Sequence, residues 1–302
     1  MNFFCHSKRS VSELKNLIFL IFICFLLIFT SCSKKTEKPE ITIYTSFYPL
    51  EQFTKWIIPE AEVHGLIPQG VDPHHFEPSL KDIQKLYTAK MVIYIGDTDI
   101  DRWIDKIKNE LTEKGVKVIR LQEYISLKKY SKGNEIDPHV WLDPLAVIEI
   151  IKVIKNVAQE VYPDKKETYE KNFLDYESKL KQLDSDYRET LSTCSKKDVI
   201  ITHEFLNYTG ARYGFNSYFI VHEPEEEPSV KKIKNLKDFM KRHSIQYIVS
   251  ELEGQKIAQT LSEETGAKIL QFYTFHNKTN KDYFQVMHDN LQTLKTALEC
   301  NK

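Results

Sequence analysis

The 302-residue sequence lacks an apolar run long enough to cross a membrane. Its longest such run, residues 17–29, contains 13 residues, whereas a membrane-spanning helix needs about 20. Lys8, Arg9 and Lys15 precede this run, and that order is typical of a secretory signal peptide. We therefore predict that residues 1–31 are a signal peptide and that the folded part lies outside the cytoplasm.

The predicted signal peptide ends in small residues before a cysteine. The sequence Phe29-Thr30-Ser31-Cys32 resembles the lipobox of bacterial lipoproteins, in which the cysteine is lipidated and becomes the mature N-terminus. It departs from the usual pattern at Phe29, where leucine is common. The resemblance implies that an acylated Cys32 anchors the protein in the lipid bilayer. Residues 32–40 are polar and are expected to form a tether; an uncleaved anchor and ordinary secretion are the alternatives.

Cysteine is otherwise scarce, and no CxxC pair is present. Of the five cysteines, Cys5 and Cys24 belong to the predicted signal peptide, so Cys194 and Cys300 remain in the folded part. In an oxidising compartment these two either form a disulfide or stay separate thiols. The sequence leaves both possibilities open.

An excess of positive charge is also absent. The chain has 42 Lys and Arg residues against 43 Asp and Glu residues. Removal of residues 1–31 takes away three basic and one acidic side chain, which leaves a net charge of −3. Recognition of a nucleic acid needs a basic face, so the composition predicts no nucleic-acid partner.

From Ile41 onward, short β-rich runs alternate with longer amphipathic runs, a pattern typical of βα units and parallel sheets. Helical runs are clearest at 79–87, 99–114, 231–242 and 283–298. The expected strands are residues 41–45, 62–66, 91–95 and 117–121 in a first series, and 199–202, 217–221, 247–250 and 268–272 in a second. The sequence therefore predicts an α/β fold with two lobes, each holding a roughly four-stranded parallel sheet flanked by helices.

Between the two series, residues 144–191 show no strand signal, while apolar residues recur at helical spacing. Pro163 interrupts this pattern, so a long helix, bent or interrupted at Pro163, is expected to join the lobes. We accordingly predict an N-terminal lobe over residues 41–143, a linking helix over 144–192 and a C-terminal lobe over 193–302.

Four histidines follow expected strands. They are His74 in DPHHFEP, His139 in DPHVWLDP, His203 in ITHEFLNY and His276 in YTFHNK. Ligands of open α/β sheets bind beyond the carboxyl ends of the strands, and two histidines from each lobe would place a metal in the cleft between the lobes. Neutral imidazole favours a borderline metal such as Zn²⁺, whereas Mn²⁺ prefers more oxygen ligands. The pattern predicts a zinc site.

These motifs also resemble those of a known family. DPHHFEP, DPHVWLDP and THEFLNYTGARYGF are similar, in this order, to the ligand motifs of the metal-specific solute-binding lipoproteins of bacterial ABC importers, the zinc and manganese uptake class. EPEEEPS and SEETGAKIL resemble family segments that carry no ligand, and the likeness runs from about residue 41 to 298. It implies that His74, His139 and His203 are metal ligands and that histidine at the third position goes with zinc. It also implies a monomer that delivers Zn²⁺ to a membrane permease and its ATPase.

The sequence departs from the family at the fourth position, where an aspartate usually follows the last strand. Here no carboxylate occurs between residue 272 and Asp282. His276 is the candidate substitute, and a water, Glu77 or Glu251 are the rivals. Zinc held by three histidines with one open position is also chemically acceptable.

Two other functions fit some of these features. A metallohydrolase also holds zinc with three histidines and an open position, but it needs a general base. No HExxH motif is present, and Glu204 follows His203 without a second histidine four residues on, so we expect no enzyme. A surface adhesin stays an open alternative, because an adhesive patch has no required residue pattern.

Overall fold

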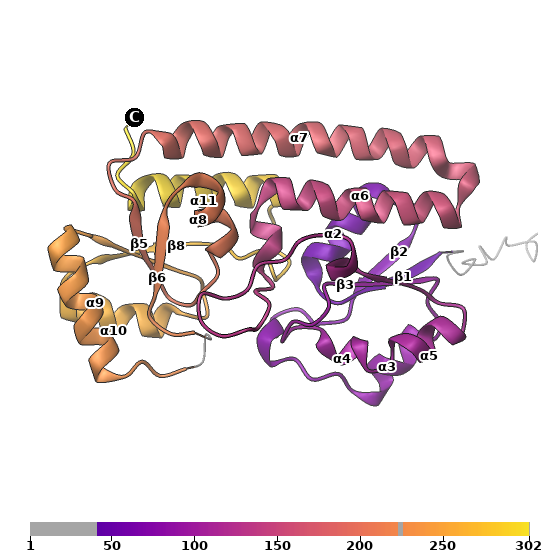
Figure 1. Cartoon of the computed structure of the whole chain (residues 1–302), viewed down its shortest axis with the longest axis horizontal. Coiled ribbons are helices and arrows are strands. Elements are labelled where there is room, and N and C mark those ends of the chain that lie inside the picture. Colours follow the sequence, from indigo (N-terminus) through magenta and orange to yellow (C-terminus); the bar gives the residue numbers. More distant parts are fainter. Residues whose placement is uncertain (1–40, 223–225, 302) are drawn as a thin grey trace, which may run out of the picture. The chain divides into compact units, whose positions relative to one another are not determined.

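The computed structural model describes residues 41–222 and 226–301 of the chain (Figure 1). The predicted signal peptide, Cys32 and the tether lie outside the described residues. The fold class predicted from the sequence is confirmed, since two four-stranded parallel sheets are flanked by helices. Within the described part, no helix has the length and apolar character that crossing a membrane requires.

The first sheet has the strand order β2-β1-β3-β4, and every neighbouring pair is parallel. Its strands are β1 (Thr42–Thr45), β2 (Glu62–Gly65), β3 (Met91–Tyr94) and β4 (Lys117–Arg120). Successive side chains of a strand point to opposite faces. Met91 and Ile93 accordingly enter the largest hydrophobic core, whereas Val92 and Tyr94 enter a smaller one. Helices on both faces therefore bury the sheet.

Four helices accompany the first sheet, namely α2 (Tyr48–Ile57), α3 (Leu80–Leu86), α4 (Arg102–Asp105) and α5 (Lys108–Glu113). The helical run predicted over residues 99–114 contains two separate helices, α4 and α5. Between them the backbone tightens, as the Ile107 N–H donates to the Ile104 carbonyl at 3.0 Å. Ile104 of α4 and Leu111 of α5 both belong to the smaller core.

The second sheet repeats this plan with the order β6-β5-β7-β8, again fully parallel. Its strands are β5 (Asp198–Ile201), β6 (Asn216–Phe219), β7 (Tyr247–Ser250) and β8 (Lys268–Gln271). Its helices are α8 (Asn207–Tyr213), α9 (Val230–His243), α10 (Gln255–Thr265) and α11 (Tyr283–Ala297). Ile200 and Ile248 face a core shared with α9 and α10, while Val199 and Val249 face the largest core.

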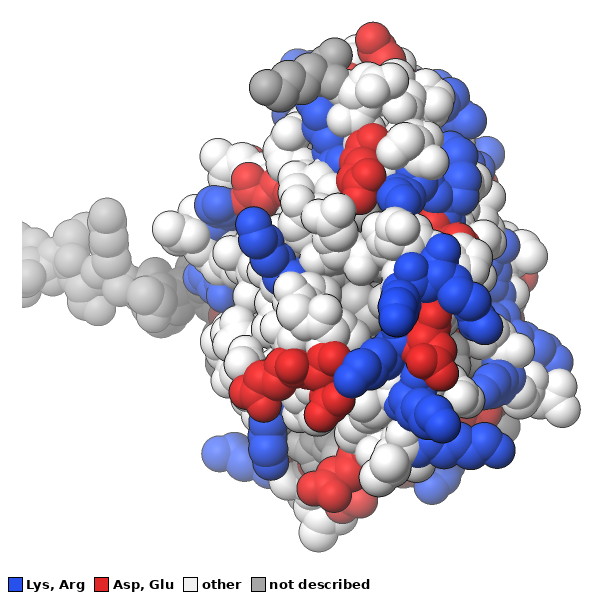
Figure 2. Space-filling model, turned by 90° about the vertical axis from the view of Figure 1, so that its left-hand side faces the viewer, with Lys and Arg blue, Asp and Glu red and all other residues white. Residues whose placement is uncertain are grey.

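Basic side chains gather on α9, at the outer end of the second half. They are Lys231, Lys232, Lys234, Lys237, Lys241 and Arg242. Figure 2 looks onto this end of the molecule and shows Lys and Arg side chains with acidic side chains among them. Lys237, for example, pairs with Glu264 of α10 at 2.9 Å. The surface at this end is therefore mixed in charge.

The segment between the two sheets is a helical hairpin. Helix α6 (Pro144–Val161) ends at Tyr162, and after the short turn η4 (Pro163–Lys165) the 27-residue α7 (Lys166–Ser192) runs back alongside it (Figure 1). Proline disfavours the helical conformation in the residue before it, and Tyr162 is correspondingly non-helical, with φ −129° and ψ 70°. The predicted interruption at Pro163 is thus a reversal of the chain, and α7 is the long helix that reaches the second half.

The largest hydrophobic core continues through both halves. It contains Ile43 of the first sheet, Val199 of the second, and residues of α2, α6, α7 and α11. Residues 41–302 accordingly form one compact unit. The lobe bounds at residues 143 and 192 remain a proposal.

Cys194 and Cys300 are joined by a disulfide. The backbone beside it is paired as well, because the Lys196 N–H donates to the Leu298 carbonyl at 3.0 Å and the Ser195 N–H donates to the Glu299 carbonyl at 3.3 Å. The end of α11 is therefore held against the start of the second sheet.

Candidate metal centre

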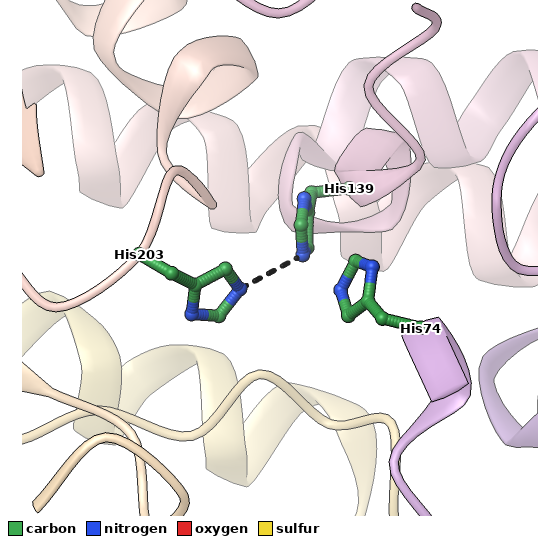
Figure 3. Close-up of side chains that lie close together, drawn as sticks. All are labelled: His74, His139 and His203. Atoms are coloured by element: carbon green, nitrogen blue, oxygen red, sulfur yellow. Dashed lines mark hydrogen bonds between the residues drawn. The ribbon is translucent and has the colours of Figure 1, made fainter. Parts of the chain in front are cut away.

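Three of the four predicted histidines lie together. His74 belongs to a short 3₁₀ turn, η1 (Pro73–His75), His139 begins another, η3 (His139–Leu142), and His203 follows β5. Each offers one ring nitrogen, and these nitrogens lie within 4.8 Å of one another. Figure 3 shows the three rings turned toward a common centre. The structure thus brings together histidines from both series of strands.

The same Asp-Pro-His turn sets the backbone of two of these histidines. The carboxylate of Asp72 accepts the His74 N–H at 2.9 Å, and the carboxylate of Asp137 accepts the His139 N–H at 2.9 Å. The intervening proline restricts φ, so little freedom is left in either turn. Both histidines are therefore placed by local structure before any metal binds.

A carboxylate oxygen also lies against the Nδ1 atom of each ring. The pairs are His74 with Asp99 at 2.5 Å, His139 with Asp137 at 2.8 Å, and His203 with Glu251 at 2.9 Å. A carboxylate at Nδ1 fixes the tautomer in which Nδ1 carries the proton, and it raises the basicity of Nε2. All three rings are thus prepared to bind a cation through Nε2.

Glu251 is itself held tightly behind His203. Its second oxygen accepts a hydrogen bond from the Thr202 hydroxyl at 2.5 Å. A Cβ atom at Gly254 would lie 2.5 Å from Glu251 Oε1 and 2.6 Å from Thr202 Cβ. Because such distances are not tolerated, only glycine at position 254 leaves room for this carboxylate.

The spacing of the ring nitrogens suits a tetrahedral metal. The Nε2 atoms of His139 and His203 are 3.4 Å apart. Two nitrogen ligands at the usual zinc distance of about 2.0–2.1 Å, separated by a tetrahedral angle, would be about 3.3 Å apart. The ring centroid of His74 lies 5.3 Å from that of His139 and 5.7 Å from that of His203. The three rings therefore occupy positions close to three corners of a zinc tetrahedron.

The site is shielded from water. His139 is 1% exposed and His203 is 2% exposed, and the rings of Trp141 and Phe205 pack against them at centroid distances of 5.2 and 5.0 Å. Burial, together with the positive charges of the neighbouring histidines, holds the pKa of His139 well below its usual range. This ring is consequently neutral and ready to bind a metal.

The carboxylates differ in their electrostatics. Burial raises the pKa of Asp137 to about 7, against the lowering effect of its hydrogen bonds. Burial also acts to raise the pKa of Asp99 and Glu251, but hydrogen bonds and positive charge from His74 and His203, respectively, more than offset it and lower both. Asp99 and Glu251 are therefore anionic and favour positive charge at the centre of the site.

The family of the chain is established by its similarity to known proteins. Residues 43–297 match the model of the ZnuA family, described as "Zinc-uptake complex component A periplasmic". The chain belongs to this family. The family is that of a periplasmic component of a zinc-uptake complex, which is a solute-binding transport component and not an enzyme, so membership in it argues against the metallohydrolase hypothesis.

Individual relatives agree. The zinc-binding protein AdcA of Streptococcus pyogenes is 32% identical over 323 residues, which cover 97% of this chain and 62% of AdcA. The chain therefore spans less than two thirds of that relative. The high-affinity zinc uptake system protein ZnuA of Bacillus subtilis is 30% identical over 313 residues, covering 93% of this chain and 97% of that protein. Among solved structures, the Zn(II)-bound ZnuA-like domain of Streptococcus pneumoniae AdcA has a TM-score of 0.76 and 35% identity, with 86% of this chain and 99% of that chain covered.

His276, the fourth predicted ligand, does not belong to the three-histidine group. Its Nδ1 lies 2.5 Å from the Thr274 hydroxyl, and its Nε2 lies 3.3 Å from a carboxylate oxygen of Glu253. Its charge nonetheless contributes to the lowered pKa of His139, so it lies near the site. His276 sits on the loop after β8, as the sequence predicted, but its ring is held by neighbouring side chains.

The carboxylates considered as rivals have other positions. Glu251 holds Nδ1 of His203, and Glu77 is exposed. Glu204, although adjacent to His203 in the chain, accepts the Ser131 N–H at 2.6 Å through Oε1. The same oxygen accepts a hydrogen bond from the Asn207 side chain at 2.8 Å. These contacts occupy one oxygen of the carboxylate, and the other, Oε2, lies 3.4 Å from Nδ1 of His222.

Sequence reasoning missed Asp99 and Asp137 behind the histidines, and it considered Glu251 only as a possible metal ligand. Asp137 stands two residues before His139 within the motif, and that spacing was a usable signal. Asp99 lies 25 residues after His74 and carried no such signal.

Proposed function

We propose that the protein captures Zn²⁺ outside the cytoplasm and delivers it to the permease of an ABC importer. The observation that carries this proposal is the approach of three ring nitrogens, from His74, His139 and His203, to within 4.8 Å of one another. The zinc-binding and zinc-uptake names of the relatives support it. Three neutral nitrogen ligands favour Zn²⁺ over Mn²⁺, which prefers oxygen. Manganese binding is the alternative within the same class.

Binding would proceed by replacement of protons and water. The ring nitrogens that bind the metal must be unprotonated, so zinc uptake releases any proton that they carry. Two ligands come from loops of the first sheet and one from a loop of the second, so zinc joins the two halves. Docking on the permease would separate these loops slightly and weaken coordination.

The fourth corner of the tetrahedron is proposed for His276 or a water. His276 would have to exchange its contacts with Thr274 and Glu253 for the metal. Rotation of one side chain is a small change compared with movement of a strand. Water as fourth ligand would leave His276 where it stands.

The partners and the anchor are part of the same proposal. A permease and its ATPase follow from membership in an uptake family, and an acylated Cys32 would keep the protein, as a monomer, near them. A Cys32→Ala variant should lose incorporation of a labelled fatty acid and partition into the soluble fraction. Retention of the label on this variant would contradict the proposed site of lipidation.

The central experiment is a zinc titration of the mature protein with metal analysis. Alanine substitution of His74, His139 or His203 should weaken zinc binding at least about 100-fold, because each removes one of few ligands. His288→Ala is the matched control, since His288 is exposed on α11 and contacts Asp186 outside the site. Zinc binding that survives all three substitutions unchanged would refute the proposal.

Two further outcomes of the titration decide the details. His276→Ala should weaken zinc at least about tenfold if this ring is the fourth ligand, and full retention would assign that corner to water. Manganese affinity equal to or above zinc affinity in the wild-type protein would favour the alternative metal.

A further inference from the structure

Two loops from opposite sheets meet at the surface beside the metal centre. The first runs from the end of β2 to η1 and leads directly to His74. The second follows β8 and carries His276. Gln69 and Gly70 of the first loop contact Asn277 and Lys278 of the second.

The contacts between these loops are reciprocal. Oδ1 of Asn277 accepts the Gly70 N–H at 2.8 Å and a hydrogen bond from Gln69 Nε2 at 3.0 Å. Oε1 of Gln69 accepts the Lys278 N–H at 2.9 Å, and Gln69 Nε2 lies 3.4 Å from the Lys278 carbonyl. Each side chain thus binds the backbone of the opposite loop. We call this set of contacts the loop latch.

The rest of the second loop is anchored independently of the latch. The Thr274 carbonyl accepts a hydrogen bond from the buried indole of Trp141 at 2.6 Å, and Asn290 exchanges hydrogen bonds with the backbone of Tyr273 at 2.8 Å. Only the tip, residues 276–279, depends on contacts near the surface. Opening of the latch therefore requires no disruption of the core.

The first loop is equally suited to a local opening. Its start is held to the sheet, since the Leu66 N–H donates to the Thr45 carbonyl at 2.9 Å. Gly70 then adopts φ +81°, a conformation that favours glycine, and it directs its N–H toward Asn277. Gln69 and Gly70 are both exposed, so water competes for every bond of the latch.

We propose that Gln69 and Asn277 are positioning residues that control how fast the metal leaves. When its hydrogen bonds are formed, the loop latch holds the segment that carries His74 against the segment that carries His276. When these hydrogen bonds break, the His74 turn is able to move away from the more deeply buried His139 and His203. The metal then loses its outermost ligand first. This inference rests on the proposed function, because it concerns the release of the proposed zinc ion.

Position 277 supplies a discriminating pair of variants. Asn277 acts as an acceptor toward both Gly70 and Gln69, so Asn277→Asp retains the acceptor while Asn277→Ala removes it. Gln259→Ala is a matched control, because Gln259 is an exposed glutamine of α10 whose side chain donates a hydrogen bond to Glu263 of the same helix, away from the latch. If any surface substitution changed the rate of zinc release, Gln259→Ala would change it as well.

The first measurement is the rate at which the zinc-loaded protein transfers zinc to excess 4-(2-pyridylazo)resorcinol in a stopped-flow experiment. Asn277→Ala should release zinc about tenfold faster, as expected for the loss of two modest hydrogen bonds. Asn277→Asp and Gln259→Ala should stay within about threefold of the wild-type rate. Equal rates for Asn277→Ala and the wild type would overturn the inference.

The second measurement, amide hydrogen exchange of the metal-free protein, does not depend on zinc. Asn277→Ala should speed exchange of the Gly70 amide, and Gln69→Ala should speed exchange of the Lys278 amide, each on the loop opposite the substitution. Unchanged exchange at both amides would show that the latch does not form in solution. Absence of zinc binding in the wild type, with normal cross-loop protection, would instead refute the proposed function and leave the latch without a metal to control.

Discussion

The carboxylate of Glu251 provides the sharpest test of how the protein prepares its ligands. Glu251 is 1% exposed and contacts Nδ1 of His203 at 2.9 Å, and Thr202 holds its other oxygen. A Glu251→Gln substitution keeps the size of the side chain and an oxygen for the His203 N–H, but it removes the negative charge. The ring should therefore stay in place while its Nε2 becomes a weaker ligand.

The magnitude follows from the role of such outer carboxylates. Loss of one typically weakens metal binding 10- to 100-fold, which corresponds to about 1.4–2.7 kcal/mol. Burial places Glu251 toward the upper part of this range, because hydrogen bonds to a charged group are stronger where water is excluded. Gly254→Ala should have a similar effect, since the added Cβ would displace the carboxylate from His203.

The assay is a competition titration of zinc against a fluorescent chelator at neutral pH. Glu253→Gln is the control, because Glu253 carries the same charge two residues further along but contacts His276 at 3.3 Å instead of a member of the three-histidine group. Glu253→Gln should change the zinc affinity by less than about threefold if water is the fourth ligand. An unchanged affinity in Glu251→Gln, or equal losses in both variants, would refute the idea that Glu251 acts by preparing His203.

Three other predictions concern acid, the disulfide and an ion pair. Zinc affinity should fall as the pH drops below about 6.5, the ordinary pKa of imidazole, because the ligating ring nitrogens must be unprotonated, and an affinity that is unchanged at about pH 5 would contradict ligation by histidine. Replacement of Cys194 and Cys300 by serine should lower the free energy of unfolding by up to about 5 kcal/mol in urea titrations, since the bridge closes a loop with a sequence separation of 106. An unchanged midpoint would refute the estimate. Burial acts to raise the pKa of Asp105, but the hydrogen bond from Arg120 and other contacts outweigh it and lower the pKa overall. Asp105→Asn should therefore lower the free energy of unfolding at neutral pH, and the difference from wild type should shrink as the pH falls below about 4. A difference that persists at lower pH would argue against ionic stabilisation.

The strand pattern and three histidines were predictable because both depend on local rules. Buried strands of a parallel sheet appear as short apolar runs, and the loops after them converge at one edge, which placed His74, His139 and His203 together. Sequence reasoning could not give the reversal at Pro163, since a proline in a helical stretch is compatible with either a bend or a turn. Whether the chain bends or reverses at Pro163 depends on which arrangement lets α6 and α7 bury more apolar surface.

The outer contacts of the site were less predictable. Asp99, on the loop after β3, reaches His74, on the loop after β2, although β1 lies between these two strands, and the order β2-β1-β3-β4 was not readable from the chain. The orientation of His276 depends on Thr274 of its own loop and on Glu253, which lies between β7 and α10, so it combines a local contact with one that comes from another part of the chain. Position after the expected strands therefore identified the candidate ligands, while the supporting contacts required the topology.

The continuous hydrophobic core has a consequence for how the molecule loses its structure. Because α7 and the residues around it belong to one core that includes both sheets, neither half can melt without exposing apolar surface of the other. We expect a single cooperative calorimetric transition, with equal calorimetric and van't Hoff enthalpies. Two resolved transitions would show that the halves are energetically independent despite their common core.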